Sequence, residues 1–136
     1  MRPAKMQHLK TWLAQKICFW LPIVFGCHQK PERSFFFLGK QFPICARCTG
    51  QLAGMLCGCI GAWLCQIPFQ LSVVLMLPML ADGFCQMLTA YESTNCRRFL
   101  TGCLFGFGLV QIFVLSSQFV FWHGLQYGQR IAKGYF

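Results

Sequence analysis

Apolar residues along the chain gather into four segments that are separated by shorter polar stretches. The last three segments cover about residues 48–67, 71–89 and 99–122. Each is close to the roughly 20 residues that an α-helix needs to cross the hydrocarbon layer of a membrane. The stretch QIPFQ interrupts the first two of them, and its proline cannot continue a helix. The pattern therefore predicts three transmembrane helices in this part of the chain.

The first apolar segment, at about residues 13–26, is shorter. Only ICFWLPIVFG within it is free of charge, so Lys16 would have to extend toward the membrane surface. The segment either crosses the membrane as a fourth helix or enters and leaves on one side as a re-entrant segment. A basic stretch precedes it, as in a signal peptide, but no small-residue cleavage site follows it. We expect the segment to be retained.

The composition supports an integral membrane protein. Apolar residues make up 56% of the 136 residues and charged residues only 11%, whereas soluble domains carry about 25% charged residues. Neither an internal repeat nor a low-complexity linker divides the chain. The sequence therefore predicts an all-α helical bundle with four transmembrane helices, or three and a re-entrant segment. It forms a single domain over residues 1–136 of a multi-pass protein of the cell membrane.

The net charge of +9 comes from 12 Lys and Arg residues against three acidic residues. A basic surplus is typical of proteins that bind nucleic acid or a membrane surface. Here the basic residues lie at the ends of apolar segments, which is the arrangement expected beside anionic lipid headgroups. We therefore expect contact with the lipid bilayer and none with nucleic acid. The basic residues divide equally between the two expected faces, so the positive-inside rule assigns no orientation. The lack of a disulfide pattern favours a site that faces the reducing cytoplasm.

Small residues recur at helical spacing in two of the predicted helices. Gly50, Gly54 and Gly58 are four residues apart, and Gly102 and Gly106 repeat the spacing in the last helix. In lipid, helices associate largely through close packing over small residues. We predict that these two helices are in contact.

Two polar connections, at residues 27–47 and 90–98, should emerge on the same membrane face, because the two helices between them cross and return. Together they carry most of the reactive side chains. These are Cys27, His28, Arg33, Cys45, Arg47 and Cys48 in the first connection, and Glu92, Ser93, Asn95, Arg97 and Arg98 in the second. The stretch SFFFL in the first connection is apolar enough to enter the headgroup layer.

Asp82 lies about two helical turns below that face, inside a predicted transmembrane helix. Gln86 and Thr89 follow at i+4 and i+7 and form a polar stripe toward the connection. An ionisable side chain at this depth is costly in hydrocarbon, so it should face the bundle interior and a charged partner. Arg97 or Arg98 is the expected partner of Asp82.

Metal binding is the first chemistry that the thiols suggest. Cys45 and Cys48 form a C-x2-C pair, and Cys27 and His28 lie 18 and 17 residues before Cys45. Three thiolates, with or without an imidazole, match the ligands of zinc. The alternative is a set of reduced thiols at a helix end, with His28 hydrogen-bonded at the membrane surface.

Thiol redox chemistry is the second candidate. A C-x-x-C pair at a helix N-terminus, with Arg47 between the two cysteines, should have a lowered thiol pKa. Cys27 would then serve as the resolving thiol. The other connection offers only Cys96, whereas membrane disulfide oxidoreductases typically use a second pair.

Anion binding is the third candidate. Helix N-termini favour phosphate or carboxylate, and Ser93 and Asn95 are suitable caps for the last helix. Arg97 and Arg98 oppose the helix dipole in the first turn, so they should find an anion. We assign Arg33, Arg47, Arg97, Arg98, Ser93 and Asn95 to anion binding. Asp82 and Glu92 are candidate catalytic proton carriers, or members of an internal ion-pair network.

The blocks CHQKPERSF, PICARCTG, DGFCQ and ESTNCRRFLTG resemble those of a small prokaryotic integral-membrane family known as domain of unknown function 2085. They span residues 27–102. The resemblance marks as characteristic Cys27, His28, Gln29, Arg33, Ser34, Cys45, Arg47, Cys48, Thr49, Gly50, Asp82, Gln86, Glu92, Ser93, Thr94, Asn95, Arg98 and Gly102. The chain departs from the family in carrying Gln51 and Leu52 where an Ile-Tyr pair is expected, and in a longer basic tail. The resemblance implies a site and no reaction.

Taken together, the sequence predicts a membrane protein with a thiolate, arginine and carboxylate site on one face. The leading hypothesis is a metal-supported enzyme or carrier, with zinc as the metal, that acts on an anionic lipid or a phosphorylated small molecule. Cys27, His28, Cys45 and Cys48 are the candidate ligands. The alternatives are a membrane thiol-disulfide redox protein and a non-catalytic structural subunit.

Overall fold

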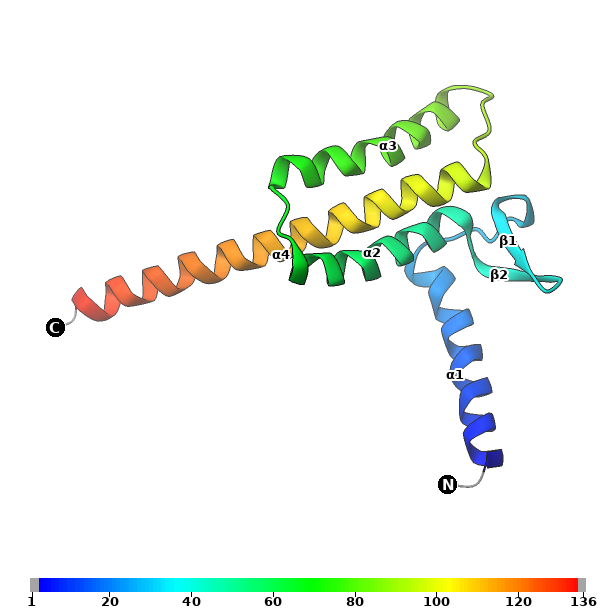
Figure 1. Cartoon of the computed structure of the whole chain (residues 1–136), viewed down its shortest axis with the longest axis horizontal. Helices are drawn as coiled ribbons and strands as arrows, with labels where there is room; N and C mark the ends of the chain where they lie inside the picture. Colours follow the sequence, from blue (N-terminus) through cyan, green and yellow to red (C-terminus); the bar gives the residue numbers. More distant parts are fainter. Residues whose placement is uncertain (1–2, 135–136) are drawn as a thin grey trace.

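The computed structural model describes the backbone of residues 3–134 and is mostly helical (Figure 1). The helices in this part of the chain are α1 (Pro3–Val24), α2 (Ala46–Leu64), α3 (Phe69–Leu88) and α4 (Asn95–Gly134). Both α3 and α4 are long and apolar enough to cross a membrane. The apolar pattern thus identified the helical class.

A three-helix bundle forms the centre of the molecule. Helix α4 lies between α2 and α3 (Figure 1). The chain runs along α2, returns along α3 through a short connection at residues 65–68, and turns again at residues 89–94 into α4. As a result α2 and α4 are parallel to each other, and their N-termini lie at the same end of the bundle as the C-terminus of α3.

Glycines bring α2 and α4 into backbone contact. A Cβ atom at Gly54 would clash with the carbonyl oxygen of Cys103, and one at Gly106 with the carbonyl oxygen of Gln51. Gly50 approaches α4 in the same way. The predicted contact between these two helices is confirmed, and it rests on close backbone packing over small residues.

Polar side chains occupy the bundle interior, and apolar side chains cover its surface. The buried polar residues of the three helices are Ser72, Asp82, Arg98, Thr101 and Gln111. The exposed residues on α3 include Leu71, Leu77, Phe84 and Met87. This distribution of side chains is the reverse of the one in a soluble domain, and it is typical of helices that are surrounded by lipid.

The first polar connection contains structure that the sequence analysis did not predict. It folds into a short 3₁₀ helix, η1 (Pro31–Arg33), and an antiparallel hairpin of β1 (Ser34–Phe37) and β2 (Lys40–Cys45). The all-α class is therefore wrong in this one respect. Aromatic residues favour a strand, and a two-residue turn with φ of 49° at Leu38 and 74° at Gly39 closes the hairpin.

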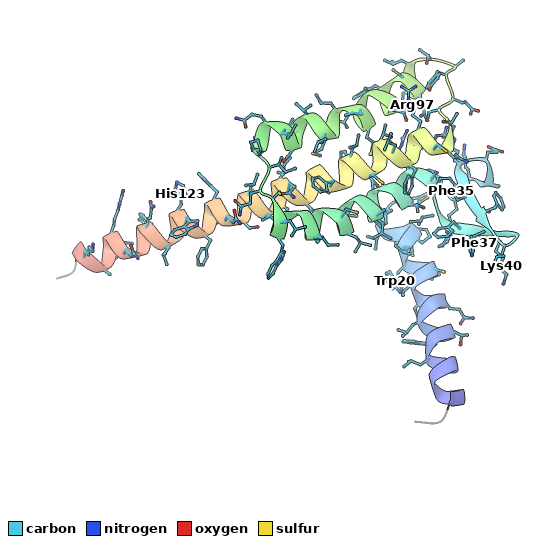
Figure 2. The ribbon with its side chains drawn as sticks, viewed as in Figure 1. Trp20, Phe35, Phe37, Lys40, Arg97 and His123 are labelled. Atoms are coloured by element: carbon cyan, nitrogen blue, oxygen red, sulfur yellow. The ribbon has the colours of Figure 1, made fainter. Side chains whose placement is uncertain are left out.

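The predicted four-helix bundle is also not what the structure shows, because α1 points away from the other helices (Figure 1). The far half of α4 likewise extends beyond the ends of α2 and α3. This helix has 40 residues, or a length of about 60 Å at 1.5 Å per residue. It begins at Asn95 and continues to Gly134. The sequence had instead predicted a helix at about residues 99–122, followed by a polar tail. Figure 2 shows Trp20 on α1 and His123 on the free half of α4, and His123 is far from the hairpin.

The glycine contact predicts the effect of adding one methyl group. Gly54→Ala should destabilise the bundle by roughly 1–3 kcal/mol, because the new Cβ has no room against the backbone of α4. The measurement is detergent unfolding in mixed micelles followed by circular dichroism. Gly124→Ala is the matched control, since a Cβ there meets nothing within 4 Å. Equal stability of the two variants would contradict the packing.

Candidate functional site

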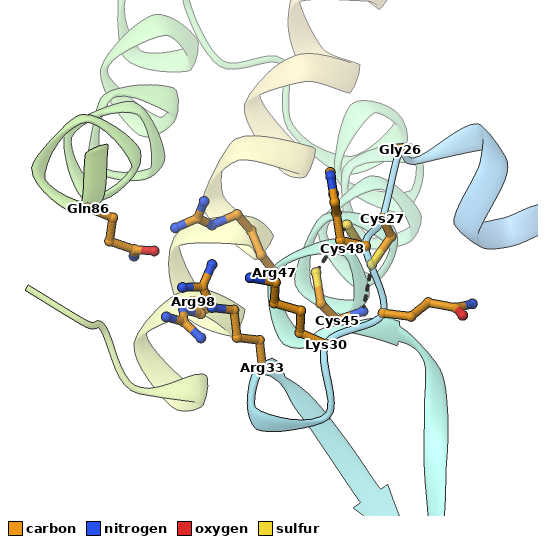
Figure 3. A pocket seen from close by; sticks show the side chains of 11 residues that line it. Gly26, Cys27, Lys30, Arg33, Cys45, Arg47, Cys48, Gln86 and Arg98 are labelled. Carbon is orange, nitrogen blue, oxygen red and sulfur yellow. Dashed lines mark hydrogen bonds between the residues drawn. The ribbon is translucent and has the colours of Figure 1, made fainter. Parts of the chain in front are cut away.

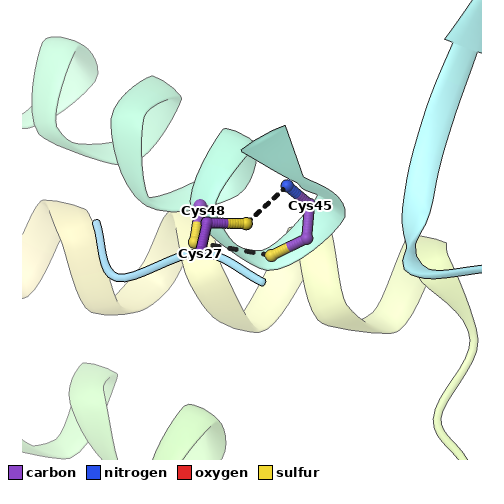
Figure 4. Close-up of side chains that lie close together, drawn as sticks. All are labelled: Cys27, Cys45 and Cys48. Atoms are coloured by element: carbon purple, nitrogen blue, oxygen red, sulfur yellow. Dashed lines mark hydrogen bonds between the residues drawn. The ribbon is translucent and has the colours of Figure 1, made fainter. Parts of the chain in front are cut away.

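Three cysteines converge at the N-terminus of α2 (Figure 4). Cys45 ends β2 and caps the helix, Cys48 lies in its first turn, and Cys27 follows α1. Their sulfur atoms all lie within 4.8 Å of one another. The Sγ atoms of Cys45 and Cys48 are 3.4 Å apart, and the backbone N–H of Cys45 donates a hydrogen bond of 3.1 Å to Cys27 Sγ.

Two glutamine side chains hold Cys27 beside the hairpin. Gln29 Nε2 donates to the carbonyl oxygen of Pro43 at 2.9 Å, and Gln41 Nε2 donates to the carbonyl oxygen of Gln29 at 2.9 Å. These bonds fix the segment after α1 against β2. The hairpin thus positions one thiol from a part of the chain that is distant from the C-x2-C pair.

The geometry of the thiols suits a tetrahedral metal ion. With Zn–S bonds of about 2.3 Å, the sulfurs of a tetrahedral site are roughly 3.8 Å apart. The sulfurs of Cys45 and Cys48 are 3.4 Å apart and all three lie within 4.8 Å of one another, so the group is compact enough for such a site. Among the described residues, the structure does not bring His28 into this group. His28 is exposed and lines the adjacent cavity instead.

The thiol of Cys45 is the one poised to ionise. A hydrogen bond from the Cys48 thiol lowers the pKa of Cys45 to about 5, and backbone N–H groups of Cys48 and Arg47 act in the same direction. Burial opposes this change but does not outweigh it. A thiolate is the form that binds metals and attacks electrophiles.

A cavity of about 390 Å³ opens beside the thiols (Figure 3). The thiols form one part of its wall, and four basic side chains form another. These are Lys30, Arg33, Arg47 and Arg98. No carboxylate lines the cavity in the described part of the chain. The site therefore has an excess of positive charge next to three potential metal ligands.

Asp82 organises the polar centre of the bundle. Its side chain is 1% exposed, and its Oδ2 atom accepts hydrogen bonds from Arg47 at 2.6 Å, Gln86 at 2.8 Å and Ser93 at 3.2 Å. Arg97 Nε lies 3.7 Å from Oδ1. The expected pairing with Arg97 is thus present, but the shortest contact is with Arg47, which the sequence analysis had assigned only to anion binding.

Arg98 is the other buried cation of the site. It is 5% exposed, and its Nε donates to Ser93 Oγ at 3.0 Å. Arg98 forms no ion pair with any described residue, and its two terminal amino groups make no hydrogen bond there. Because the side chain lines the cavity, these groups are available to a ligand.

The three polar residues at the start of α4, Ser93, Thr94 and Asn95, have different partners. Ser93 joins the Asp82 network, whereas the Oγ1 atom of Thr94 accepts a bond of 3.4 Å from the backbone N–H of Arg97. Asn95 Nδ2 donates to the carbonyl oxygen of Glu32 at 3.3 Å and so links α4 to η1.

Glu92 lies apart from Asp82, at the surface. It is 80% exposed and pairs with Arg33 at 3.5 Å. Both residues border a second cavity, which shares Arg47 and Gln86 with the network around Asp82. Figure 2 places Arg97 at this end of the bundle, together with Phe35 and Phe37 of the hairpin.

The structure is therefore a helical bundle with a polar interior and an apolar surface, and thiols and cations gather at one of its ends. The chain belongs to the family described as predicted membrane protein (DUF2085), whose model matches residues 27–112. That range contains the hairpin, α2, α3 and the part of α4 that packs against them. It includes every residue of the site.

Two archaeal proteins are similar to this chain. An uncharacterised protein of Methanothermobacter thermautotrophicus is 41% identical over 88 residues, which cover 61% of this chain and 79% of the relative. An uncharacterised protein of Methanocaldococcus jannaschii is 36% identical over 106 residues, which cover 73% of this chain and 68% of the relative. No solved structure matches the chain.

The Asp82 network predicts a large loss of stability when one partner is removed. Asp82→Asn should cost about 3 kcal/mol or more, because it leaves Arg47 inside the bundle without its counter-charge. Replacing both residues, in the double variant Arg47→Met and Asp82→Leu, should recover much of that loss. Unfolding in mixed micelles measures both effects.

Glu92→Gln is the control for this experiment. It removes an ion pair at the surface and should cost less than about 1 kcal/mol. A cost for Asp82→Asn as small as that for Glu92→Gln would contradict the network.

Proposed function

We propose that this protein binds a zinc ion through Cys27, Cys45 and Cys48 and uses it in an enzyme or carrier that acts on an anionic, phosphorylated ligand. The observation that carries the proposal is the position of three thiols at the wall of a cavity that is otherwise lined by cations. Thiolates select soft or borderline metals, of which zinc is a common one in proteins.

The ligand set supports a reactive centre rather than a purely structural one. Structural zinc sites normally have four protein ligands, whereas catalytic sites have three and leave one position for water or substrate. His28, the fourth candidate in the sequence, is not part of the thiol group. A metal held by the three thiolates alone would have an open position.

The charge of the cavity supports an anionic ligand. Three thiolates and one Zn²⁺ ion together carry a charge of −1. Arg47 and Arg33 are paired with Asp82 and Glu92, so Lys30 and Arg98 leave the cavity with one positive charge in excess. Arg33, Arg47, Arg97 and Arg98, with Ser93 and Asn95 to fix the start of α4, are the residues that we assign to anion recognition.

The two carboxylates have different surroundings. Asp82 accepts hydrogen bonds from Arg47, Gln86 and Ser93 and forms an ion pair with Arg97, so we propose that it positions the two arginines. Glu92 is exposed beside Arg33 and is the better placed of the two to transfer a proton.

The membrane arrangement that we infer has three spanning helices in one domain. Helix α2 lies against α4, so it enters the bilayer together with α3 and α4. The 20 residues of α3 give a length of about 30 Å, which matches the hydrocarbon layer. Helix α1 points away from the bundle, and its exposed apolar and aromatic side chains suit the membrane surface. The hairpin tip, with Phe36, Phe37 and Leu38 exposed, suits the headgroup layer on the same face.

A thiol-disulfide redox protein is the second candidate. The separation of 3.4 Å between the sulfurs of Cys45 and Cys48, together with the lowered pKa of Cys45, favours it. Cys27, which is close to both, would resolve a mixed disulfide. A non-catalytic structural subunit is the third class, and it needs neither metal nor thiol reactivity.

Metal analysis of the purified full chain tests the proposal. The wild-type protein should contain about one zinc per chain, because three thiolates complete a protein ligand set. Cys45→Ser and Cys48→Ser should lose most of it. Cys57→Ser and Cys59→Ser are matched controls, since both cysteines are exposed on α2 away from the site, and they should retain the metal.

The same samples separate the alternatives. Metal-free wild-type protein in which a mild oxidant reversibly closes a disulfide between Cys45 and Cys48 would contradict the metal proposal and favour the redox protein. Metal-free protein with unreactive thiols would favour the structural subunit.

A further inference from the structure

Resting on the proposed metal centre, we propose that the cavity binds a phosphate-type group. One oxygen of this group takes the open position on the metal, and Arg98 and Lys30 hold its other oxygens. Beyond the proposed function, this assigns the atom that completes the metal site, the group of the ligand that supplies it, and the two residues that bind the rest of that group. None of the three follows from the thiols alone.

Arg98 is a buried cation at the wall of the cavity. Its side chain is 95% removed from solvent, since only 5% is exposed, and its single hydrogen bond within the described chain uses Nε. A buried charge without a counter-charge is costly. The terminal amino groups of Arg98 border the cavity, so an anion in the cavity would supply the missing partner (Figure 3).

The acidic residues of the chain do not neutralise all the cations of the cavity. The chain has three acidic residues. Asp82 pairs with Arg47 and Arg97, Glu92 pairs with Arg33, and Glu32 lies exposed on η1. Lys30 and Arg98 therefore line the cavity without an acidic partner among the described residues. Together with the charge of −1 on a zinc ion held by three thiolates, these two cations leave a positive charge that an anionic phosphate group in the cavity would neutralise.

Shape distinguishes phosphate from carboxylate. A carboxylate has two oxygens, which a single guanidinium can occupy completely through a bidentate contact. A phosphate monoester has three terminal oxygens, so it can bind a guanidinium through two of them and still offer one to a metal. Arg98 and the three thiols line different parts of the same cavity, so a ligand with three terminal oxygens has oxygens for both.

A free phosphate compound and a phospholipid headgroup both carry this chemistry. The exposed apolar tip of the hairpin gives the site a membrane-facing neighbour, whereas the open cavity also admits a small solute. The experiment therefore has one arm for each source.

Cobalt-loaded protein provides the readout. Co²⁺ in place of zinc gives a thiolate charge-transfer band, which reports the three-cysteine site, and visible d–d bands, which respond to a change of the fourth ligand. In the first arm, inorganic phosphate is titrated into the full-length protein in detergent. In the second arm, nanodiscs of phosphatidylcholine alone are compared with nanodiscs that also contain phosphatidic acid.

We expect a saturable change in the d–d bands of the wild-type protein in at least one arm. A response in both arms identifies the phosphate group itself as the ligand. A response to phosphatidic acid alone identifies the lipid headgroup. Acetate should cause no comparable change.

Single substitutions test whether Arg98 and Lys30 bind the phosphate group. Arg98→Gln should bind phosphate at least tenfold more weakly while it keeps the charge-transfer band, which shows that the metal site is still folded. Lys30→Gln, at an exposed position that tolerates change, should weaken binding in the same direction. Arg130→Gln, on the free half of α4, is the matched control and should bind as the wild type does.

The outcomes separate the two proposals. A charge-transfer band with no response to either phosphate source, or an unchanged affinity in Arg98→Gln, overturns this inference and leaves the metal centre intact. Absence of the charge-transfer band in the wild-type protein overturns both.

Discussion

The ion pair between Arg47 and Asp82 connects the bundle to the site. Asp82 is buried inside α3, so its charge requires a partner in the interior. Arg47 supplies it from the first turn of α2, between Cys45 and Cys48 in the sequence. The pair therefore fixes the rotation of the helix end that carries two of the three thiols. Gln86 and Ser93 donate further hydrogen bonds to Asp82 Oδ2, and Ser93 connects the same network to Arg98.

The surrounding lipid determines which interactions hold the three helices together. In lipid the apolar surface of α2, α3 and α4 gives little drive for association, so close glycine contacts and interior polar bonds hold the bundle together. Glycine packing between α2 and α4 aligns their N-termini at one end. The hairpin and the segment after α1 then close that end. The result is a cavity with thiols on one side and guanidinium groups on the other, which suits an anion at a metal better than a simple structural role.

Sequence patterns predicted the helical class, the glycine contact and the meeting of the two polar connections. These depend on local periodicity and on the alternation of membrane crossings. The hairpin was missed because its strands lie in a polar connection, although SFFF before Leu38 and Gly39 was a usable signal. The predicted pairing of Asp82 with Arg97 is present, but the shorter contact with Arg47 was missed, because the direction of Arg47 depends on how α2 is rotated. The separation of α1 from the bundle, and of His28 from the thiols, depends on tertiary contacts that no local pattern encodes.

The central claim is a metal held by three thiolates with a fourth position open to an oxygen ligand. X-ray absorption spectroscopy of the zinc-loaded wild-type protein tests it most directly. The account predicts about three sulfur neighbours at roughly 2.3 Å and one lighter neighbour, oxygen or nitrogen, at about 2.0 Å. A first shell without sulfur, or one with four sulfurs, would contradict it.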